Sequence, residues 1–134
     1  MNEATLTADR FGISENAYSF DGLSSFISVN ESISLKPTNS ISISLFCYID
    51  STNSNCFIGI INKYLNPDPS YSSYQIITGN GGLGQTRDAG ITIRTNNIYM
   101  CSGVTGVSYL NQWAHIVGTH DGNTIKCYKN GILV

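Results

Sequence analysis

Paired carboxylates could perform acid–base hydrolysis, but this sequence keeps its acidic residues apart. Retaining hydrolysis of a glycosidic bond needs two carboxylates about 5–5.5 Å from each other. On a strand, a pair on one face would be spaced i and i+2 or i+4. The acidic residues are Glu3, Glu15, Glu31, Asp9, Asp21, Asp50, Asp68, Asp88 and Asp121. The glutamates lie near the N-terminus and the aspartates are isolated, so we expect no enzyme activity.

Cysteine and histidine offer a second chemistry. Cys47 or Cys127 could be drawn with His115 as a nucleophile and its base, but the sequence defines no geometry for such a pair. We expect His115 to hydrogen-bond a neighbour in a structural role, and His120, which precedes a turn, to be exposed. The four cysteines are Cys47, Cys56, Cys101 and Cys127. They lack C-x-x-C spacing, which disfavours a zinc site, and we expect mostly free thiols, with Cys47 and Cys127 packed as small apolar residues.

A tyrosine-rich loop is the candidate ligand site. A sugar site needs an aromatic platform with polar side chains beside it, since stacking on a ring buries apolar area. Three tyrosines and three polar residues surround a loop that holds Pro67 and Pro69. The candidate ligand-binding residues are Tyr64, Asn66, Asp68, Tyr71, Tyr74 and Gln75. The alternative is that these tyrosines are half-buried at the edges of a sheet.

The elements that would position these residues are strands. Apolar residues alternate with serines from Ile41 to Ile49, a period of two that predicts a strand with one face on the core. The further predicted strands are 16–20, 26–29, 56–64, 74–78, 89–95, 98–101, 113–119 and 124–128. A loop is expected over 79–84, and residues 16–20 and 26–29 are expected to form a hairpin. Trp113 and the face of Ile41, Ile43 and Leu45 are expected in the core. No segment shows helical periodicity, so the fold class is all-β, an antiparallel two-sheet β-sandwich.

Two turn signals end the chain. Asp121-Gly122 and Asn130-Gly131 each follow a strand, and both dipeptides tolerate the positive φ of a type I′ turn. Two such turns nine residues apart predict an antiparallel meander.

Charge and hydropathy disfavour two classes of partner. The formal net charge is −2, and the seven basic residues are scattered, so nucleic acid is not an expected partner. No apolar run reaches the ~20 residues of a membrane span, so membrane insertion is not expected. No signal peptide is visible at the N-terminus of this chain.

Several motifs resemble the laminin-G-like jelly roll of the concanavalin A-like lectin and glucanase superfamily. They are Ala17-Tyr-Ser-Phe-Asp-Gly22, Phe26-Ile-Ser-Val29, Ser40-Ile-Ser-Ile-Ser-Leu45, Trp113-Ala-His-Ile-Val-Gly-Thr-His-Asp-Gly122 and Tyr128-Lys-Asn-Gly131. The resemblance implies one laminin-G-like domain over residues 1–134, a fragment of the jelly roll that is incomplete at both ends. Open edges on an incomplete sandwich lead us to expect edge-strand self-association.

The resemblance also brings calcium as the candidate cofactor. Relatives bind it at a sandwich rim through Asp, Asn and backbone carbonyls, which are the hard oxygen ligands that calcium takes. The candidate metal ligands here are Asp21, Asn66, Asp68 and Asp88. Each is also an ordinary turn or loop residue.

Family resemblance and acidic-residue spacing together predict a non-catalytic binding or adhesion module of a larger exported protein. The resemblance implies an extracellular or cell-surface location and a carbohydrate or extracellular protein ligand, with glycan binding favoured. A purely structural or protein-adhesion domain is the alternative, and a glycoside hydrolase is the least favoured reading.

Overall fold

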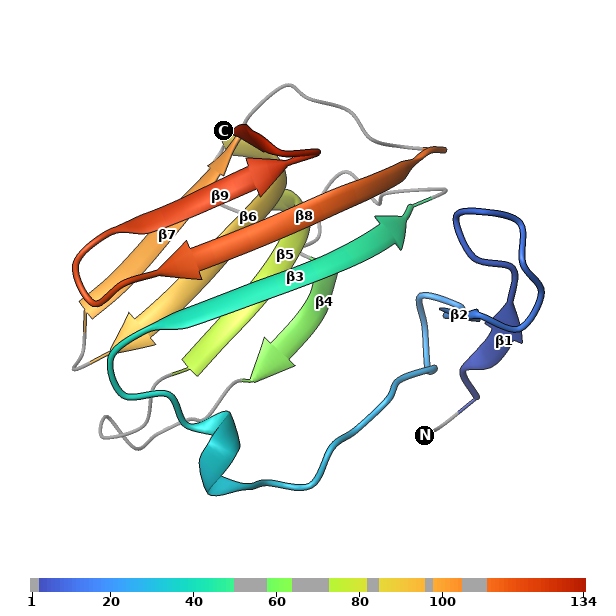
Figure 1. Cartoon of the computed structure of the whole chain (residues 1–134), viewed down its shortest axis with the longest axis horizontal. Helices are drawn as coiled ribbons and strands as arrows, with labels where there is room; N and C mark the ends of the chain where they lie inside the picture. The colour runs from blue at the N-terminus through green and yellow to red at the C-terminus, as the bar shows by residue number, and fades with distance from the viewer. Residues whose placement is uncertain (1–2, 50–57, 64–72, 82–84, 96–97, 105–110) are drawn as a thin grey trace. The chain divides into compact units, whose positions relative to one another are not determined.

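A computed structural model of the chain describes residues 3–49, 58–63, 73–81, 85–95, 98–104 and 111–134 (Figure 1). The described residues form strands and one short 3-10 helix, without an α-helix, and the all-β prediction is confirmed. No helix of this described part is long and apolar enough to cross a membrane. The chain divides into two compact units, Met1–Leu35 and Lys36–Val134, which are described separately below.

The first unit, Met1–Leu35, holds two short strands and a 3-10 turn. Strand β1 (Thr5–Thr7) pairs antiparallel with β2 (Ala17–Ser19), and η1 spans Ile33–Leu35. The predicted hairpin between 16–20 and 26–29 is wrong, because β2 takes β1 as its partner. The chain after β2 folds around a carboxylate instead, since Asp21 Oδ1 accepts the backbone N–H groups of Leu23, Ser24 and Ser25.

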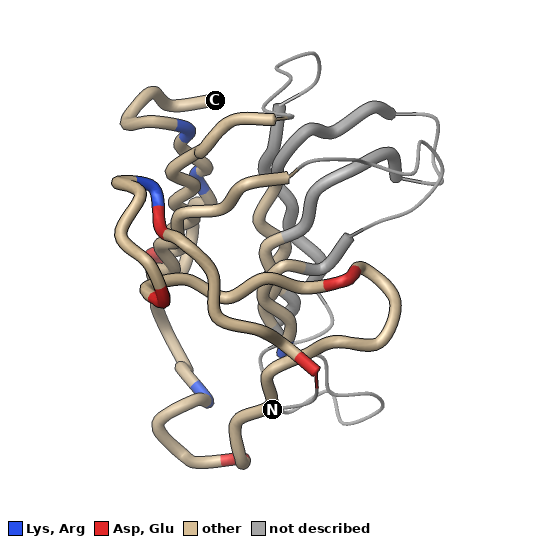
Figure 2. Tube along the Cα trace, turned by 90° about the vertical axis from the view of Figure 1, so that its right-hand side faces the viewer, with Lys and Arg blue, Asp and Glu red and all other residues tan. Residues whose placement is uncertain are grey.

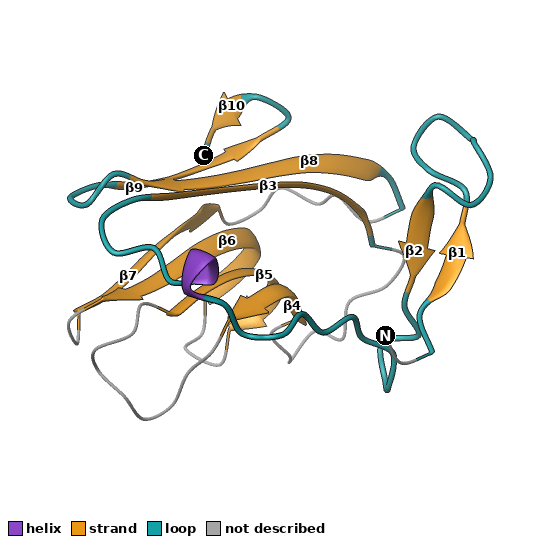
Figure 3. Cartoon of the chain, turned by 60° about the horizontal axis from the view of Figure 1, so that its bottom comes forward, coloured by secondary structure: helices purple, strands orange, loops and turns teal. Residues whose placement is uncertain are grey.

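The second unit, Lys36–Val134, is a sandwich of two four-stranded sheets. Its strands are β3 (Ile41–Tyr48), β4 (Ile58–Lys63), β5 (Ser73–Gly81), β6 (Gln85–Thr95), β7 (Ile98–Val104), β8 (Trp113–His120), β9 (Ile125–Lys129) and β10 (Ile132–Leu133). The first sheet has the order β10-β9-β8-β3, and the second has the order β4-β5-β6-β7. The strands pair antiparallel, and the sheets lie face to face (Figures 1 and 3). The two-sheet prediction is therefore confirmed.

The glycine segment after Thr78 extends a strand rather than forming a loop. Gly79, Asn80 and Gly81 belong to β5, and Gly79 pairs with Arg87 of β6 after a bulge in the register. The prediction of a loop over 79–84 is therefore wrong for residues 79–81, which belong to β5.

The C-terminal meander β8-β9-β10 is as predicted, but its two turns differ. Asn130 and Gly131 have φ angles of 48° and 82°, as a two-residue type I′ turn requires. The other turn is a four-residue loop, because His120 pairs with Ile125. Only Gly122 of that loop has positive φ, and Asp121 Oδ1 accepts the N–H groups of Asn123 and Thr124 at 2.9 and 2.7 Å. The type I′ prediction at Asp121-Gly122 is wrong because this carboxylate organises the loop.

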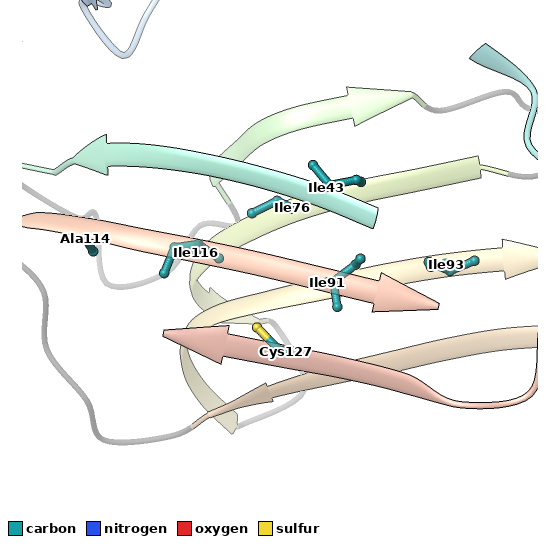
Figure 4. Packing of buried hydrophobic residues seen from close by; sticks show 7 residues of the cluster. All are labelled: Ile43, Ile76, Ile91, Ile93, Ala114, Ile116 and Cys127. Atoms are coloured by element: carbon teal, nitrogen blue, oxygen red, sulfur yellow. The ribbon is translucent and has the colours of Figure 1, made fainter. Parts of the chain in front are cut away.

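The core of the second unit lies between the two sheets. Its buried members are Ile43, Ile76, Ile91, Ile93, Ala114, Ile116 and Cys127, contributed by both sheets (Figure 4). Ile41 and Leu45 pack partly buried against this cluster, which confirms the predicted core face of β3. Each fully buried isoleucine side chain stabilises the fold by about 1.5–3 kcal/mol.

Strand β8 turns its aromatic residue away from this core. Burial alternates along β8, and Ala114, Ile116, Gly118 and His120 are its buried residues. Trp113 has the opposite parity and is half-buried, so the prediction that it is a core residue is wrong. Strand β8 packs against the opposing sheet through its face of small and aliphatic residues, which includes Ala114, Ile116 and Gly118.

Candidate functional site

Aromatic rings gather on the outer face of the first sheet. Phe46 pairs with His115, and Tyr48 pairs with Trp113, across β3 and β8. Directly paired residues point to the same side of a sheet, and these four have the opposite parity to the buried residues. We call Phe46, Tyr48, Trp113 and His115 the ring face.

The rings of each pair are in contact. Phe46 and His115 stack with centroids 4.3 Å apart and an interplanar angle of 15°. Tyr48 and Trp113 meet edge to face, with centroids 5.9 Å apart and an angle of 64°. Phe46 is 44% exposed and Tyr48 is 48% exposed. The ring face therefore offers aromatic surface to solvent.

Hydrogen bonds hold His115 in place within the ring face. Its Nε2 lies 2.8 Å from Ser44 Oγ, and its backbone N–H donates to Asn130 Oδ1 at 2.8 Å. The predicted hydrogen bond between His115 and a neighbouring residue is confirmed. Since its ring also stacks on Phe46, the imidazole is fixed at a polar edge of the aromatic surface.

The rest of this outer face is mostly neutral. By strand register, it also carries Ser42, Ser44, Val117, Thr119, Lys126 and Tyr128. None of these outward positions on β3, β8 and β9 is acidic, and Lys126 is the single Lys or Arg among them. Across the described part, basic and acidic residues are spread along the trace (Figure 2). The face can thus stack on apolar surfaces and exchange hydrogen bonds through hydroxyl groups.

The predicted ligand loop falls largely outside the described residues. Tyr64, Asn66, Asp68 and Tyr71 lie there. Tyr74 and Gln75 are successive residues of β5 and so point to opposite faces. Tyr74 packs partly buried against the core, and the structure does not bring these two side chains onto one surface. A site built on the other members of this loop stays a prediction.

Only one of the four calcium candidates, Asp21, has a side chain among the described residues. Asp21 lies in the first unit, where the N–H groups of Ser25, Leu23 and Ser24 lower the pKa of its carboxyl. Asp88 is on β6 with its side chain outside the described part, and Asn66 and Asp68 lie outside it altogether. Among the described residues, no three His, Cys, Asp or Glu side chains cluster as metal ligands would. Calcium binding stays a prediction.

The two described cysteine side chains behave as core residues. Cys47 and Cys127 are free thiols, and both have the inward parity of the first sheet. Burial raises the pKa of Cys47 to about 11, and it also raises the pKa of Cys127. Because the thiolate is the nucleophile, burial suppresses reactivity. His115 lies on the opposite face of the sheet, so neither thiol forms a dyad with it.

His120 is buried rather than exposed, which corrects the prediction from its position before a turn. It pairs with Ile41 and Ile125 on the inner face and is 7% exposed. Its Nε2 has no hydrogen-bond partner among the residues that the structure describes. A cavity of about 10 Å³ adjoins it, with room for about one water molecule. The lining residues are Pro37, Thr38, Asn39, Ser40, Ile41, Tyr74, Ile93 and His120. This cavity cannot hold a sugar.

Sequence reasoning missed the ring face, although one signal for it is in the sequence. Phe46 and Tyr48 occupy the outward positions of β3 that are serines earlier in the strand. Two large aromatic residues at positions that face solvent indicate a surface that could bind a ligand or partner. Their partners His115 and Trp113 are 69 and 65 residues further along, and only the strand register brings them together.

Comparison with known proteins agrees with this architecture. The laminin-G-like family of the concanavalin A-like lectin/glucanases superfamily matches residues 21–134. No curated protein and no solved structure matches the chain. The matched segment begins within the first compact unit and includes the whole second unit. With its two antiparallel sheets and a family match over most of its length, the chain belongs to the concanavalin A-like lectin/glucanase superfamily as a laminin-G-like domain.

Proposed function

We propose that this chain is a non-catalytic, carbohydrate-binding module of an exported or cell-surface protein. The superfamily description names lectins, which bind carbohydrate, and glucanases, which cleave it. Membership supports a binding module in general, and the residues of this chain must decide between recognition and cleavage.

The observation that carries the proposal is the distribution of acidic residues along the strands. Within the strands of the described part, Asp88 of β6 is the single Asp or Glu. Glycoside hydrolysis needs two carboxylates at about 5–5.5 Å when retaining, or about 6.5–9.5 Å when inverting. A sheet face with one carboxylate does not supply such a pair. Binding without cleavage is therefore favoured.

A protein ligand is the second candidate, and the first unit favours it. Large apolar side chains are exposed there, among them Phe11 at 71%, Leu23 at 94% and Ile33 at 89%. Exposed apolar residues of this kind occur at protein–protein contacts. This candidate corresponds to an adhesion domain with a protein partner.

A glycan array combined with a hydrolysis assay tests the proposal. The whole chain is applied to an array of neutral and acidic glycans, and the same preparation is incubated with a β-glucan panel while released reducing ends are measured. We expect retention on at least one glycan class and no turnover. Repeating the array with a chelator tests whether retention depends on calcium, the candidate cofactor. Turnover that disappears in Asp88→Asn, or an array without any retained glycan, would contradict the proposal.

A further inference from the structure

We infer that the ring face is the carbohydrate-binding surface of this domain, and that it takes a neutral, linear oligosaccharide lying along β3 and β8. This inference rests on the proposed function and adds to it the place of the site and the class of glycan. It moves the site from the tyrosine-rich loop, 64–75, to the outer face of the first sheet.

The aromatic surface supplies the apolar half of sugar recognition. Phe46 and Tyr48 keep 44% and 48% of their surface exposed, although each contacts a ring on β8. Stacking a sugar on such a ring removes apolar surface from water. The contacts between the rings limit their rotation, so little side-chain entropy is lost when a ligand binds.

Polar side chains on the ring face and beside it supply the hydrogen bonds that sugar recognition also needs. Ser44 Oγ and His115 Nε2 are already joined at 2.8 Å, which fixes the orientation of both groups. A hydroxyl is both donor and acceptor, so Ser44 keeps hydrogen-bonding capacity for a sugar hydroxyl. Ser42 and Thr119 pair with each other on the same face and extend the polar edge. Rings beside fixed hydroxyl groups fit carbohydrate better than a wholly apolar ligand.

Charge and spacing narrow the ligand class. The outward positions of β3, β8 and β9 carry one lysine and no carboxylate, so the face lacks the basic cluster that a sulfated or uronic glycan would need. The two ring pairs are two residues apart along each strand, which is about 6–7 Å. One sugar ring cannot cover both pairs. A neutral chain of at least two sugar units is therefore the occupant that this face fits.

Intrinsic fluorescence reports on this face directly, because Trp113 is the single tryptophan of the chain. The whole chain is titrated with cellohexaose, laminarihexaose, mannohexaose and chitohexaose, and with heparin and polygalacturonate as acidic comparisons. Calorimetry on the same samples measures binding at any site. We expect a saturable change in Trp113 emission with at least one neutral hexasaccharide and none with the acidic chains.

Substitutions then place the site. Phe46→Ala and Tyr48→Ala should each weaken binding about tenfold or more, which corresponds to about 1.4 kcal/mol. Tyr18→Ala is the matched control, since Tyr18 is 44% exposed on β2, as Phe46 is on β3, and it should bind as the parent does. Tyr48→Phe keeps the ring and should retain most of the affinity, which guards against a variant that fails to fold. Circular dichroism checks the fold of every variant.

The outcomes separate this inference from the proposed function. Calorimetric binding that leaves Trp113 emission unchanged and is lost in Tyr71→Ala would return the site to the loop and overturn the inference, while the proposed function would stand. An array on which no glycan is retained would overturn both. A ring face occupied by a second copy would show emission that depends on protein concentration and a dimer in sedimentation that Phe46→Ala dissociates, and this result would also overturn the inference.

Discussion

Gly118 of β8 lies in close contact with Ile91 of the opposing sheet. It faces inward from β8, and a Cβ placed on it would lie 2.7 Å from Ile91 Cβ and closer still to Ile91 Cδ1. Ile91 is 0% exposed, so its side chain is enclosed in the core and cannot turn out into solvent. Glycine is required here by packing rather than by backbone conformation, since its φ is not positive. The absent side chain is what lets the buried isoleucine fit.

We predict that Gly118→Ala destabilises the domain by about 1–3 kcal/mol, the usual cost of forcing extra volume into a packed core. Urea denaturation followed by circular dichroism measures this change in unfolding free energy. Thr119→Ala is the control, because Thr119 is the next residue of β8 and points to the outer face. In an Ile91→Ala background, Gly118→Ala should cost less, since the smaller side chain leaves space for the new methyl group. Equal costs in the two backgrounds would show that the contact with Ile91 is not the cause.

Trp113 and His120 show where residue-level prediction stops. Both faces of β8 carry apolar side chains, Trp113 and Val117 on one and Ala114 and Ile116 on the other, so a period of two does not say which face is buried. A preference for burying the largest apolar residue selects the wrong face. The choice is made by the opposing sheet, because Ile91 requires a glycine in β8. His120 lies two residues after Gly118 and therefore on the same, buried face of β8. The sequence of β8 alone does not show that this face is the buried one.

At the scale of elements, the turn between β9 and β10 is tied to β8. Asn130 donates its backbone N–H to the carbonyl of His115 at 2.8 Å, and Asn130 Oδ1 accepts the N–H of His115 at 2.8 Å. The same residue holds a φ of 48° in the turn. Asn130 therefore extends the pairing of β8 with β9 by one residue beyond Lys129. It is also the first residue of the turn that leads to β10.

We predict that Asn130→Ala destabilises the domain more than Asn130→Gly does. Glycine loses the side-chain hydrogen bond but adopts positive φ without strain, whereas alanine loses the bond and adds about 1–2 kcal/mol of backbone strain. Thermal melting of the two variants and the parent should give the order parent, Asn130→Gly, Asn130→Ala. A glycine variant that is the less stable of the two would mean that flexibility of the unfolded chain, and not the turn, dominates.

The strands themselves are the part of the fold that periodicity predicts well. The alternation from Ile41 to Ile49 becomes β3, because this strand covers the core with alternate residues. The other strands predicted between residues 56 and 128 correspond to β4 to β9. Strand β1 was missed since Thr5–Thr7 is three residues long and exposed throughout, which leaves no hydrophobic pattern. The ring face was missed for another reason. Half of its rings come from β8, and pairing between distant strands is decided by the packed sandwich.

At the scale of the whole molecule, the two compact units differ in how they are stabilised. Every buried member of the core cluster lies between Ile43 and Cys127, within the second unit. No described residue of the first unit is buried, and its sheet has two strands. An isolated two-stranded sheet is marginally stable in water, whereas two packed four-stranded sheets can unfold as one cooperative unit.

We predict that a chain of residues 36–134 unfolds cooperatively by itself, and that a peptide of residues 1–35 shows no cooperative transition. Thermal melts followed by circular dichroism and by Trp113 fluorescence compare both with the whole chain. The two probes should give one midpoint for 36–134, as expected for a two-state domain. A broad transition without a common midpoint would show that the second unit depends on residues 1–35 for its stability.

The alternation along β3 and β8 also bears on how such a domain can change over generations. Odd-numbered residues of β3 and even-numbered residues of β8 make the core, and the residues between them face outward. Mutations at the outward positions do not change the isoleucine cluster or the contact between Gly118 and Ile91. The residues of the outer face can therefore be substituted without loss of folding. Selection can therefore change the residues of the outer face while the same hydrophobic pattern of the core is inherited. By contrast, insertion of a single residue within either strand would exchange the two sets at once, so we expect divergence by substitution and not by changes of strand length.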